Sequence, residues 1–139
     1  MPGCVLRVRT KTSNVEALVQ ASGLEGIAIF KKGHPRVPGG TVLSRSSGFN
    51  VNVSNADGVL QRQAQDAVRF LKKNARGLAR MRRCRAFDGM TLDFGVYYRA
   101  STDTPWSSYR LPVALIELAG THRVELELSF YGVEANGAG

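Results

Sequence analysis

The chain has 139 residues, of which 43% are hydrophobic and 22% are charged, and its formal net charge is +8. This length and composition are typical of one globular domain with its own core, and they exclude disordered, collagen-like and coiled-coil proteins. The longest apolar run, residues 111–119, contains Glu117 and is far shorter than the roughly 20 residues of a membrane span. Because the first ten residues lack a secretory signal pattern, we expect a cytoplasmic protein that does not enter a membrane.

The first thirty residues predict a strand, a short helix and a second strand. Residues 4–10 alternate between two faces, a pattern typical of a strand with one buried side. Ser13 with Glu16 forms a capping box, and apolar residues then recur at helical spacing until Gly23 ends the helix. Residues 27–30 are β-branched and aromatic and therefore predict a second strand.

The middle of the chain predicts a loop, a strand and a long helix. The sequence GHPRVPGG at 33–40 favours a turn and loop, and the alternation at 49–53 favours a third strand. Apolar residues keep three-and-four spacing over 60–78, which predicts a helix of five turns. Gly77 either interrupts this helix or begins a short second helical piece that carries Leu78 and Met81.

The last third of the chain predicts a strand, a brief helix and a closing strand. Residues 91–99 alternate, with Leu92 on one side and Asp93 on the other. The helix is expected over 112–119, with Gly120 closing it, because proline suits a first turn and glycine a position past the last. Residues 123–131 alternate again and predict the fifth strand.

The predicted fold is one α+β domain with the order β-α-β-β-α-β-α-β. We expect an antiparallel or mixed five-stranded sheet with helices packed on one face, a variant of the ferredoxin-like arrangement. The core should cover about residues 4–132, with a frayed Gly- and Ala-rich tail at 133–139. The residues expected to share that core are Leu6, Val8, Val51, Val53, Leu60, Val68, Leu71, Leu92, Phe94, Val96, Leu115, Leu126, Leu128 and Phe130.

The positive charge is concentrated in one segment, residues 62–85. That segment holds nine basic residues against the single acid Asp66, and the rest of the chain holds ten basic and ten acidic residues. Such a segment attracts polyanions, although basic residues also commonly coat the solvated face of an amphipathic helix. The candidate anion-binding residues are Arg69, Lys72, Lys73, Arg76 and Arg80.

Trp106 is the only tryptophan and lies in the otherwise small and polar loop at 100–108. Tryptophan is a common anchor at protein interfaces, so Trp106 with Tyr109 is a candidate partner contact. The alternative is that Trp106 folds back over a sheet edge.

No pattern in the chain indicates a catalytic, metal or cofactor site. The glycines at 33–40 lack the spacing and lysine of a phosphate-binding loop, and the histidines and cysteines are not spaced as metal ligands. Cys84, among arginines, is either a reactive thiol or a small apolar residue packed under the helical segment. We therefore expect no catalytic residue, metal ligand or cofactor-binding residue, which favours a non-enzymatic protein.

Two further patterns permit a functional and a structural interpretation. Glu125 and Glu127 share one face of a strand and resemble an acid and base pair, but they are equally placed to form ion pairs across strands on an open sheet face. The order β-α-β-β-α-β is also that of the RNA-recognition motif, whose sheet aromatics stack on bases. The aromatic signature of that module is missing here, and only Tyr97 and Tyr131 have the outward phase.

Several segments taken together resemble a known bacterial family. They are the strand at 4–10, KKGHPR at 31–36, SGFNVNVS at 47–54, FLKKN at 70–74, LDFGVYY at 92–98 and LPVALIELAGTHRVELELSFY at 111–131. Over about residues 4–132 the chain resembles the domain-of-unknown-function family 4279, departing from it in having Phe49 in place of a tryptophan. The resemblance implies a small α+β domain of unassigned activity, sometimes encoded near toxin and immunity genes, and it implies no catalytic residue.

These patterns favour a small soluble domain that acts through protein contacts, as an interaction or immunity-like module without a cofactor. The alternative function is weak, non-specific binding of polyanions or nucleic acid by the basic segment. The protein partner, the oligomeric state and the order of strands in the sheet are left open by the sequence.

Overall fold

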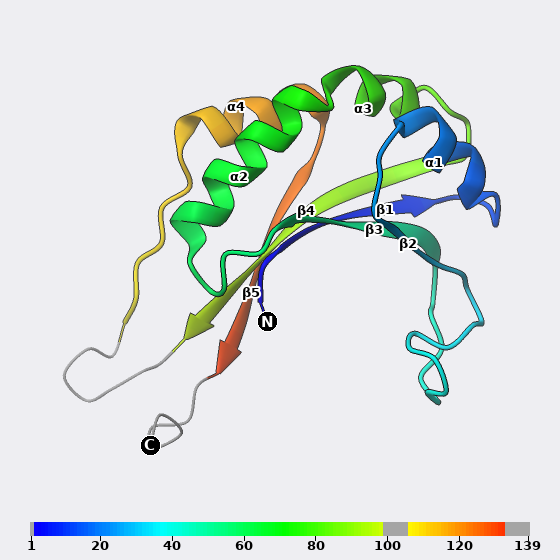
Figure 1. Cartoon of the computed structure of the whole chain (residues 1–139), viewed down its shortest axis with the longest axis horizontal. Helices are drawn as coiled ribbons and strands as arrows, with labels where there is room; N and C mark the ends of the chain where they lie inside the picture. The colour runs from blue at the N-terminus through cyan, green and yellow to red at the C-terminus, as the bar shows by residue number, and fades with distance from the viewer. Residues whose placement is uncertain (1, 99–105, 133–139) are drawn as a thin grey trace.

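The computed structural model describes residues 2–98 and 106–132, which form five strands and four helices. The helices cover one face of the sheet and leave the other face bare (Figure 1). This confirms the predicted α+β class with helices on one face. The elements in chain order are β1 (Cys4–Thr10), α1 (Val15–Ser22), β2 (Ile27–Phe30), β3 (Ser47–Ser54), α2 (Leu60–Lys73), α3 (Ala75–Arg82), β4 (Phe87–Tyr98), α4 (Val113–His122) and β5 (Glu125–Gly132).

The sheet has the strand order β2-β3-β1-β4-β5 and is mixed. Strand β1 lies between β3 and β4 and pairs with both in antiparallel orientation, which is the arrangement of interlocked split β-α-β units. Strand β5 pairs parallel with β4, after α4 has crossed over. Both β2 and β5 are therefore edge strands, and β5 extends the four-stranded unit by one.

The core lies between the sheet and the helix layer. It includes the inward-facing residues of β1, β3 and β4, such as Leu6, Phe49 and Phe94, which are fully buried. Among the predicted core residues, Val53, Val68, Leu126 and Leu128 are only partly buried but pack against this cluster.

Phe130 is a correction to the predicted core, because its side chain is 53% exposed. Its phase on β5 is the predicted one, since it pairs in register with buried Val96 of β4. However, β5 is an edge strand, and Phe130 lies near its last residue, where its contacts are with the rings of Tyr98 and Tyr109. Phase alone could not show that burial ends before the strand does.

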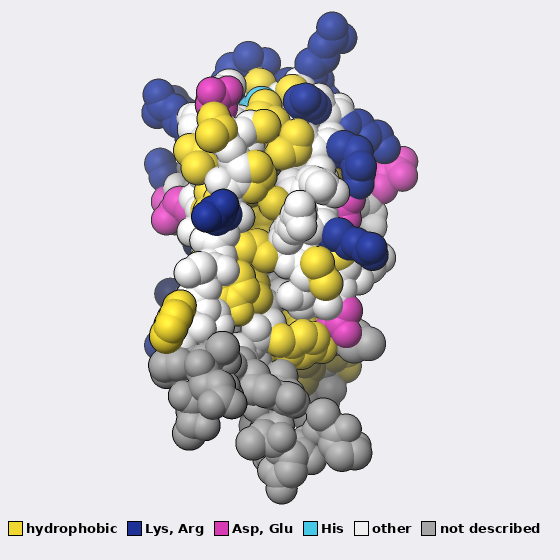
Figure 2. Space-filling view, turned by 90° about the vertical axis from the view of Figure 1, so that its left-hand side faces the viewer, with side chains coloured by type: hydrophobic (Ala, Val, Ile, Leu, Met, Phe, Trp, Pro, Cys, Tyr) yellow, Lys and Arg dark blue, Asp and Glu magenta, His cyan; other side chains and the backbone are white. Residues whose placement is uncertain are grey.

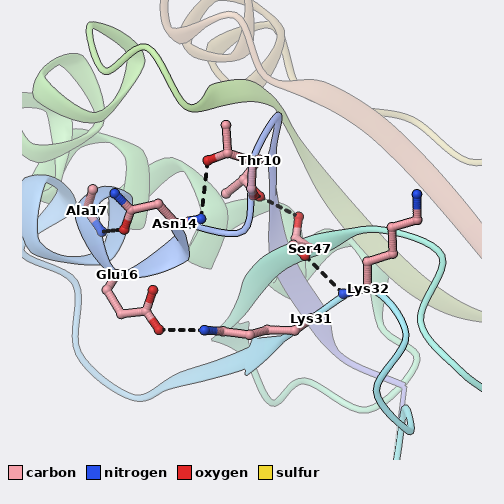
Figure 3. A network of polar contacts seen from close by, with 8 residues as sticks. Thr10, Asn14, Glu16, Ala17, Lys31, Lys32 and Ser47 are labelled. Atoms are coloured by element: carbon pink, nitrogen blue, oxygen red, sulfur yellow. Dashed lines mark hydrogen bonds and ion pairs between the residues drawn. The ribbon is translucent and has the colours of Figure 1, made fainter.

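Helix α1 starts one residue later than the capping box predicts. Asn14 is its N-cap, and the side-chain oxygen of Asn14 accepts a hydrogen bond from the amide of Ala17 (Figure 3). Glu16 instead forms an ion pair with Lys31, at 2.8 Å between Oε1 and Nζ. The end of the helix is as predicted, with Gly23 in the left-handed conformation at φ 65°.

The long helical segment is broken, but at Asn74 rather than at Gly77. The backbone amide of Asn74 makes an i to i−4 helical bond to the carbonyl of Phe70, and its side-chain amide donates to the same oxygen. The backbone of Asn74 then leaves the helical region, at φ −104° and ψ 14°. Helix α3 then begins at Ala75 and contains Gly77.

Helix α4 is longer than predicted and runs through Gly120 to His122. It begins at Val113 with Pro112 as its N-cap, and it ends at Arg123, which takes the left-handed conformation at φ 56°. The amide of Val124 donates to the carbonyl of Ala119, a Schellman-type bond. A non-glycine residue therefore closes this helix. Its end could not be predicted from the position of a glycine.

Three predictions fall wholly or partly outside the described residues. These are the end of the fourth strand at Arg99, residues 100–105 of the loop before Trp106, and the tail at 133–139. Within the described residues, no helix is both long enough and apolar enough to cross a membrane.

Candidate functional site

The predicted anion-binding residues lie on α2 and α3, and their side chains are exposed on the side away from the sheet. Lysine and arginine side chains gather over this upper, helical side of the molecule (Figure 2). Arg69 forms an ion pair with Asp66, and the Nε of Arg80 donates to the carbonyl of Ala21 at 3.1 Å. In the part of the chain that the structure describes, Lys72, Lys73 and Arg76 form no ion pair or side-chain hydrogen bond.

Tyr109 lies beside the ends of β4 and β5, and Trp106 precedes it by three residues in the same segment. Trp106 is 71% exposed, so it does not fold back over a sheet edge. Tyr109 is half-buried, packs its ring 5.7 Å from that of Phe130 and donates its hydroxyl to the carbonyl of Tyr97 at 3.1 Å. Tyr109 therefore supports the local structure, while Trp106 points outward.

Two further exposed apolar side chains lie on α4. Val113 and Ile116, one helical turn apart, are 69% and 51% exposed. We call the surface formed by Trp106, Val113, Ile116 and Phe130 the apolar edge surface. A strip of hydrophobic side chains runs down this side of the molecule, with basic side chains beside it (Figure 2).

Two depressions adjoin the apolar edge surface and share Tyr109. The larger, of about 530 Å³, lies between the start of α2 and the segment leading into α4. The smaller, of about 360 Å³, is lined by Tyr98, Ser107, Tyr109 and Phe130. The surface is thus contoured, and it ends at β5, whose outer edge pairs with no other strand described here.

The bare face of the sheet carries a network of charged side chains across its strands. Arg9 of β1 reaches Glu125 of β5 at 2.7 Å and also donates to Thr91 at 2.9 Å. Arg7 lies 3.5 Å from Asp93 of β4, which in turn accepts from Ser129 at 2.6 Å. Glu125 is therefore in a cross-strand ion pair, as the structural interpretation predicts for it. Glu127 is exposed and forms no ion pair with any other residue described here.

One further basic cluster was missed by the sequence analysis. Residues 31–46 project from the sheet on the side away from the helices (Figure 1). Between this segment and the sheet is a depression of about 470 Å³. It is lined by Arg7, Phe30, Arg36, Ser44, Arg45, Ser46 and Asn50. We call this depression the arginine pocket.

The charge pattern of the sequence contains a signal that could have pointed to the loop of the arginine pocket. Residues 26–56 contain Lys31, Lys32, Arg36 and Arg45 and no acidic residue at all. This local imbalance is hidden when the whole remainder of the chain is treated as neutral. Two arginines in a loop rich in glycine and proline are also exposed by default, because such loops lie on the surface.

The thiols and imidazoles do not assemble a reactive group. Cys4 is fully buried, and burial raises the pKa of its thiol far above the ordinary value. Cys84 is partly buried against the core, with its Sγ 3.6 Å from the carbonyl of Arg80. Among residues 2–98 and 106–132, no group of three or more His, Cys, Asp or Glu is placed to hold a metal ion.

His122 is held in a polar contact between two helices. Its side chain is buried under α3, and its Nδ1 lies 3.2 Å from an Nη1 of Arg82. Because a guanidinium only donates, Nδ1 accepts, and the imidazole is neutral. Burial, with a smaller contribution from the Arg82 charge, lowers the pKa of His122.

The bare face lacks an aromatic platform on its central strands. The side chains that β1 presents there include Val5, Arg7 and Arg9, and those of β3 include Asn50 and Asn52. Tyr97 lies at the end of β4 and donates its hydroxyl to Asp57 at 2.8 Å, which raises the pKa of the phenol. The arrangement by which an RNA-recognition motif stacks bases on its sheet is therefore not present on these strands.

The chain was compared with models of protein families, with curated proteins and with solved structures, and none of the three comparisons found a match.

Proposed function

We propose that this protein is a non-catalytic interaction module that binds a partner protein through the apolar edge surface. The observation that carries the proposal is that Trp106, Val113, Ile116 and Phe130 are each more than half exposed. A strip of hydrophobic side chains is visible on this side of the molecule (Figure 2). Contiguous exposed apolar side chains on a protein are typical of interaction sites. Tryptophan and other aromatic residues are the side chains that most often anchor such interfaces.

The shape of the surface supports binding of another protein. Strand β5 is an edge strand, so its outer backbone amides and carbonyls are available to pair with an extended segment of a partner. The two depressions beside Tyr109 offer places for the partner's side chains.

The charge around this surface favours a different protein over a second copy of the chain. Glu117 on α4 and Glu125 and Glu127 on β5 are exposed, and two copies joined through β5 would bring these carboxylates together. Like charges close to each other across an interface disfavour association. A different protein that presents apolar side chains without facing carboxylates avoids this repulsion.

The resemblance to family 4279 suggests that the interaction has an immunity-like role. Membership of that family and a cytoplasmic location both stay predictions.

The test compares two double variants that make the same chemical change at two different places. Val113→Glu/Ile116→Glu places two charges on the apolar edge surface, and the control Val37→Glu/Val42→Glu does so on the loop between β2 and β3, where each valine is 62% exposed. Proteins retained from extracts of the source cell by the wild type are identified. Each candidate is then purified and titrated while Trp106 fluorescence is recorded.

The proposal expects a partner that the wild type and the control bind and the edge variant does not, with a blue shift of Trp106 emission on binding. It is wrong if every purified candidate binds the edge variant as well as it binds the control, or leaves Trp106 emission unchanged. Sedimentation of the protein alone gives a further check. A dimer that dissociates in the edge variant would show that the partner is a second copy and overturn the argument from charge.

A second function, non-specific binding of polyanions by α2 and α3, is favoured by one specific observation. Lys72, Lys73 and Arg76 are exposed on adjacent turns around the helix break, and none forms an ion pair with another described residue. Unpaired cations in this arrangement meet several phosphates at once. The experiment that tests this function is given in the Discussion.

A further inference from the structure

The arginine pocket is a concave site that neither proposed function uses. We propose that it binds a small organic phosphate whose organic part carries an N–H or O–H hydrogen-bond donor. The pocket lies on the bare face of the sheet, under the loop between β2 and β3, and is therefore separated by the sheet from the basic helices. Its volume of about 470 Å³ lies within the range of about 300–1000 Å³ that is usual for small-molecule sites.

The charge of the pocket indicates an anionic ligand. Arg7, Arg36 and Arg45 line it, and no carboxylate does. Arg36 and Arg45 are exposed and form no ion pair with any residue that the structure describes. Guanidinium groups bind phosphate through paired, charge-assisted hydrogen bonds, which makes arginine the side chain most suited to recognising this group.

Arg7 contributes although it has a partner. Its ion pair with Asp93 is long, at 3.5 Å, and Asp93 already accepts a shorter hydrogen bond of 2.6 Å from Ser129. A guanidinium has five N–H donors, so one long contact leaves most of them to a ligand. Arg7 faces Asn50 directly across the β1–β3 pairing, at the floor of the pocket.

Asn50 supplies an independent observation that points to a ligand. Its Oδ1 is buried and has no hydrogen-bond partner among residues 2–98 and 106–132. A buried acceptor without a donor destabilises the folded protein, so such groups are rare unless something binds them. A phosphate ester that is fully ionised offers no donor, and the donor must therefore come from the organic part of the ligand.

Phe30 provides an apolar wall against which that organic part can lie. A Cβ atom at position 48 would come 2.7 Å from the Cζ of Phe30, so the ring occupies space that only glycine at this position leaves open. Gly48 is thus what allows the ring of Phe30 to rest on the sheet beside Asn50. The pocket combines an aromatic wall, an amide and three guanidinium groups.

The loop that carries Arg36 and Arg45 is held in place by hydrogen bonds. The amide of Arg36 donates to the carbonyl of Val42 at 2.9 Å within the loop. At the base of the loop, the amide of Lys32 donates to the Oγ of Ser47 at 2.9 Å, a contact drawn in Figure 3. The two arginines therefore project from an ordered scaffold, which lowers the entropic cost of binding.

The experiment measures binding of adenosine 5′-monophosphate by isothermal titration calorimetry, with adenosine and inorganic phosphate as comparison probes. The test variant is Arg36→Gln/Arg45→Gln. The control, Arg83→Gln/Arg85→Gln, removes the same charge from exposed residues after α3. Asn50→Leu replaces the amide with an apolar side chain of similar size. Thermal unfolding of each variant confirms that it is folded.

The proposal expects the wild type and the control to bind the nucleotide more tightly than either comparison probe. Binding should weaken about tenfold or more in Arg36→Gln/Arg45→Gln, because each substitution removes charge-assisted bonds. Asn50→Leu should weaken binding of the nucleotide and leave binding of inorganic phosphate unchanged. Equal losses in the test and control variants would overturn the site. Inorganic phosphate binding as tightly as the nucleotide would overturn the assigned role of Asn50 and Phe30.

Discussion

Gly77 shows how the absence of one side chain sets the distance between two helices. A Cβ atom at this position would lie 2.0 Å from the carbonyl oxygen of Ser22, at the end of α1. Helices α1 and α3 therefore touch backbone to backbone at this point. The residue that the sequence suggested as a helix breaker is instead the reason that α3 packs against α1.

We expect Gly77→Ala to lower the free energy of unfolding by about 1–3 kcal/mol, because the added methyl group forces α1 and α3 apart. Gly120→Ala is the matched control. Gly120 is also inside a helix, but nothing lies within 4 Å of a Cβ atom there, so alanine should raise stability by about 0.5–1 kcal/mol. Urea unfolding of the three proteins measures both effects. Two substitutions of the same sign and size would contradict the close contact at Gly77.

Gln63 is a residue whose role depends wholly on tertiary structure. It is fully buried, and its Nε2 donates to the carbonyls of Pro2, Ala56 and Gly95, which belong to three separate segments. Gln61 and Gln65, on either side of it in α2, are exposed. Nothing in the local sequence distinguishes the glutamine that joins the N-terminus, the β3–α2 loop and β4 from its solvated neighbours.

At the scale of elements, the basic face of α2 and α3 follows from amphipathic spacing. Leu60, Ala64 and Leu71 are buried against the sheet, and the charged residues between them are left on the outer side. The sequence therefore predicted correctly that Arg69, Lys72, Lys73 and Arg76 face solvent. It did not predict that two of the five candidate residues, Arg69 and Arg80, contact protein groups.

We expect the outer face of α2 and α3 to bind heparin and RNA without sequence preference, with a dissociation constant of about 10⁻⁴ to 10⁻⁶ M at physiological salt. Lys72→Gln/Lys73→Gln/Arg76→Gln should weaken binding equally for all sequences. It should also reduce the dependence of log affinity on log salt by about 0.7–0.9 for each phosphate that the variant no longer neutralises. The affinity and its salt dependence are measured by the salt concentration at which each protein elutes from heparin, and by titration with RNA at several salt concentrations.

The control for this experiment is Lys11→Gln/Lys32→Gln/Arg110→Gln, which removes three exposed charges that lie outside α2, α3 and the arginine pocket. If this variant loses as much affinity as the helix variant, binding depends on net charge alone. If the wild type passes through heparin at low salt, the helices do not bind polyanions.

At the scale of the whole molecule, charge and apolar surface are divided among the two faces and one edge. The helical side is basic, and the bare sheet face is basic at the β2 end, where the arginine pocket lies, and acidic towards β5. The exposed apolar side chains of the apolar edge surface lie at α4 and β5. Each of these three surfaces therefore favours a different kind of ligand: a polyanion, a small phosphate or an apolar partner.

The stability of the whole protein should decrease as the pH falls below about 6.5. Burial and Arg82 lower the pKa of His122 in the folded state below its ordinary value of 6.5. In this range the unfolded chain takes up a proton that the folded chain does not, so the free energy of unfolding falls with pH until the folded pKa is reached. Above 6.5 the contribution of His122 is constant.

Denaturant unfolding across this pH range measures the effect, and His122→Gln is the comparison. Glutamine keeps an acceptor for Arg82 but does not titrate. The free energy of unfolding of this variant should therefore change less with pH than that of the wild type, between pH 6.5 and the onset of carboxylate protonation. Asp66, whose pKa is lowered chiefly by the hydrogen bond from Ser54, causes a separate loss only at pH values below about 3.8. An unchanged pH profile in His122→Gln would show that His122 is not the group responsible.

The sequence by itself determined the class of fold and which side of most elements is buried. Strand alternation in β1 and β4 and helical spacing in α2 report directly on burial, because each element must hide one face from water. Local turn chemistry also fixed the end of α1 at Gly23. These features depend only on neighbours within a few residues, which is why they are visible in the sequence.

Only the tertiary structure decided the order of the strands, the exposure of Phe130 and the existence of the arginine pocket. Arg7, Arg36 and Asn50 are distant in the sequence and meet because β1 pairs with β3 and the loop after β2 folds over both. Pairing partners and loop paths depend on the contacts of the whole chain, and the alternation of a strand is the same at the edge of a sheet as at its centre. For that physical reason the candidate residues on the helices could be found from the sequence. For the pocket, the sequence shows only that the loop at 31–46 is basic, not that Arg7 and Asn50 complete a site with it.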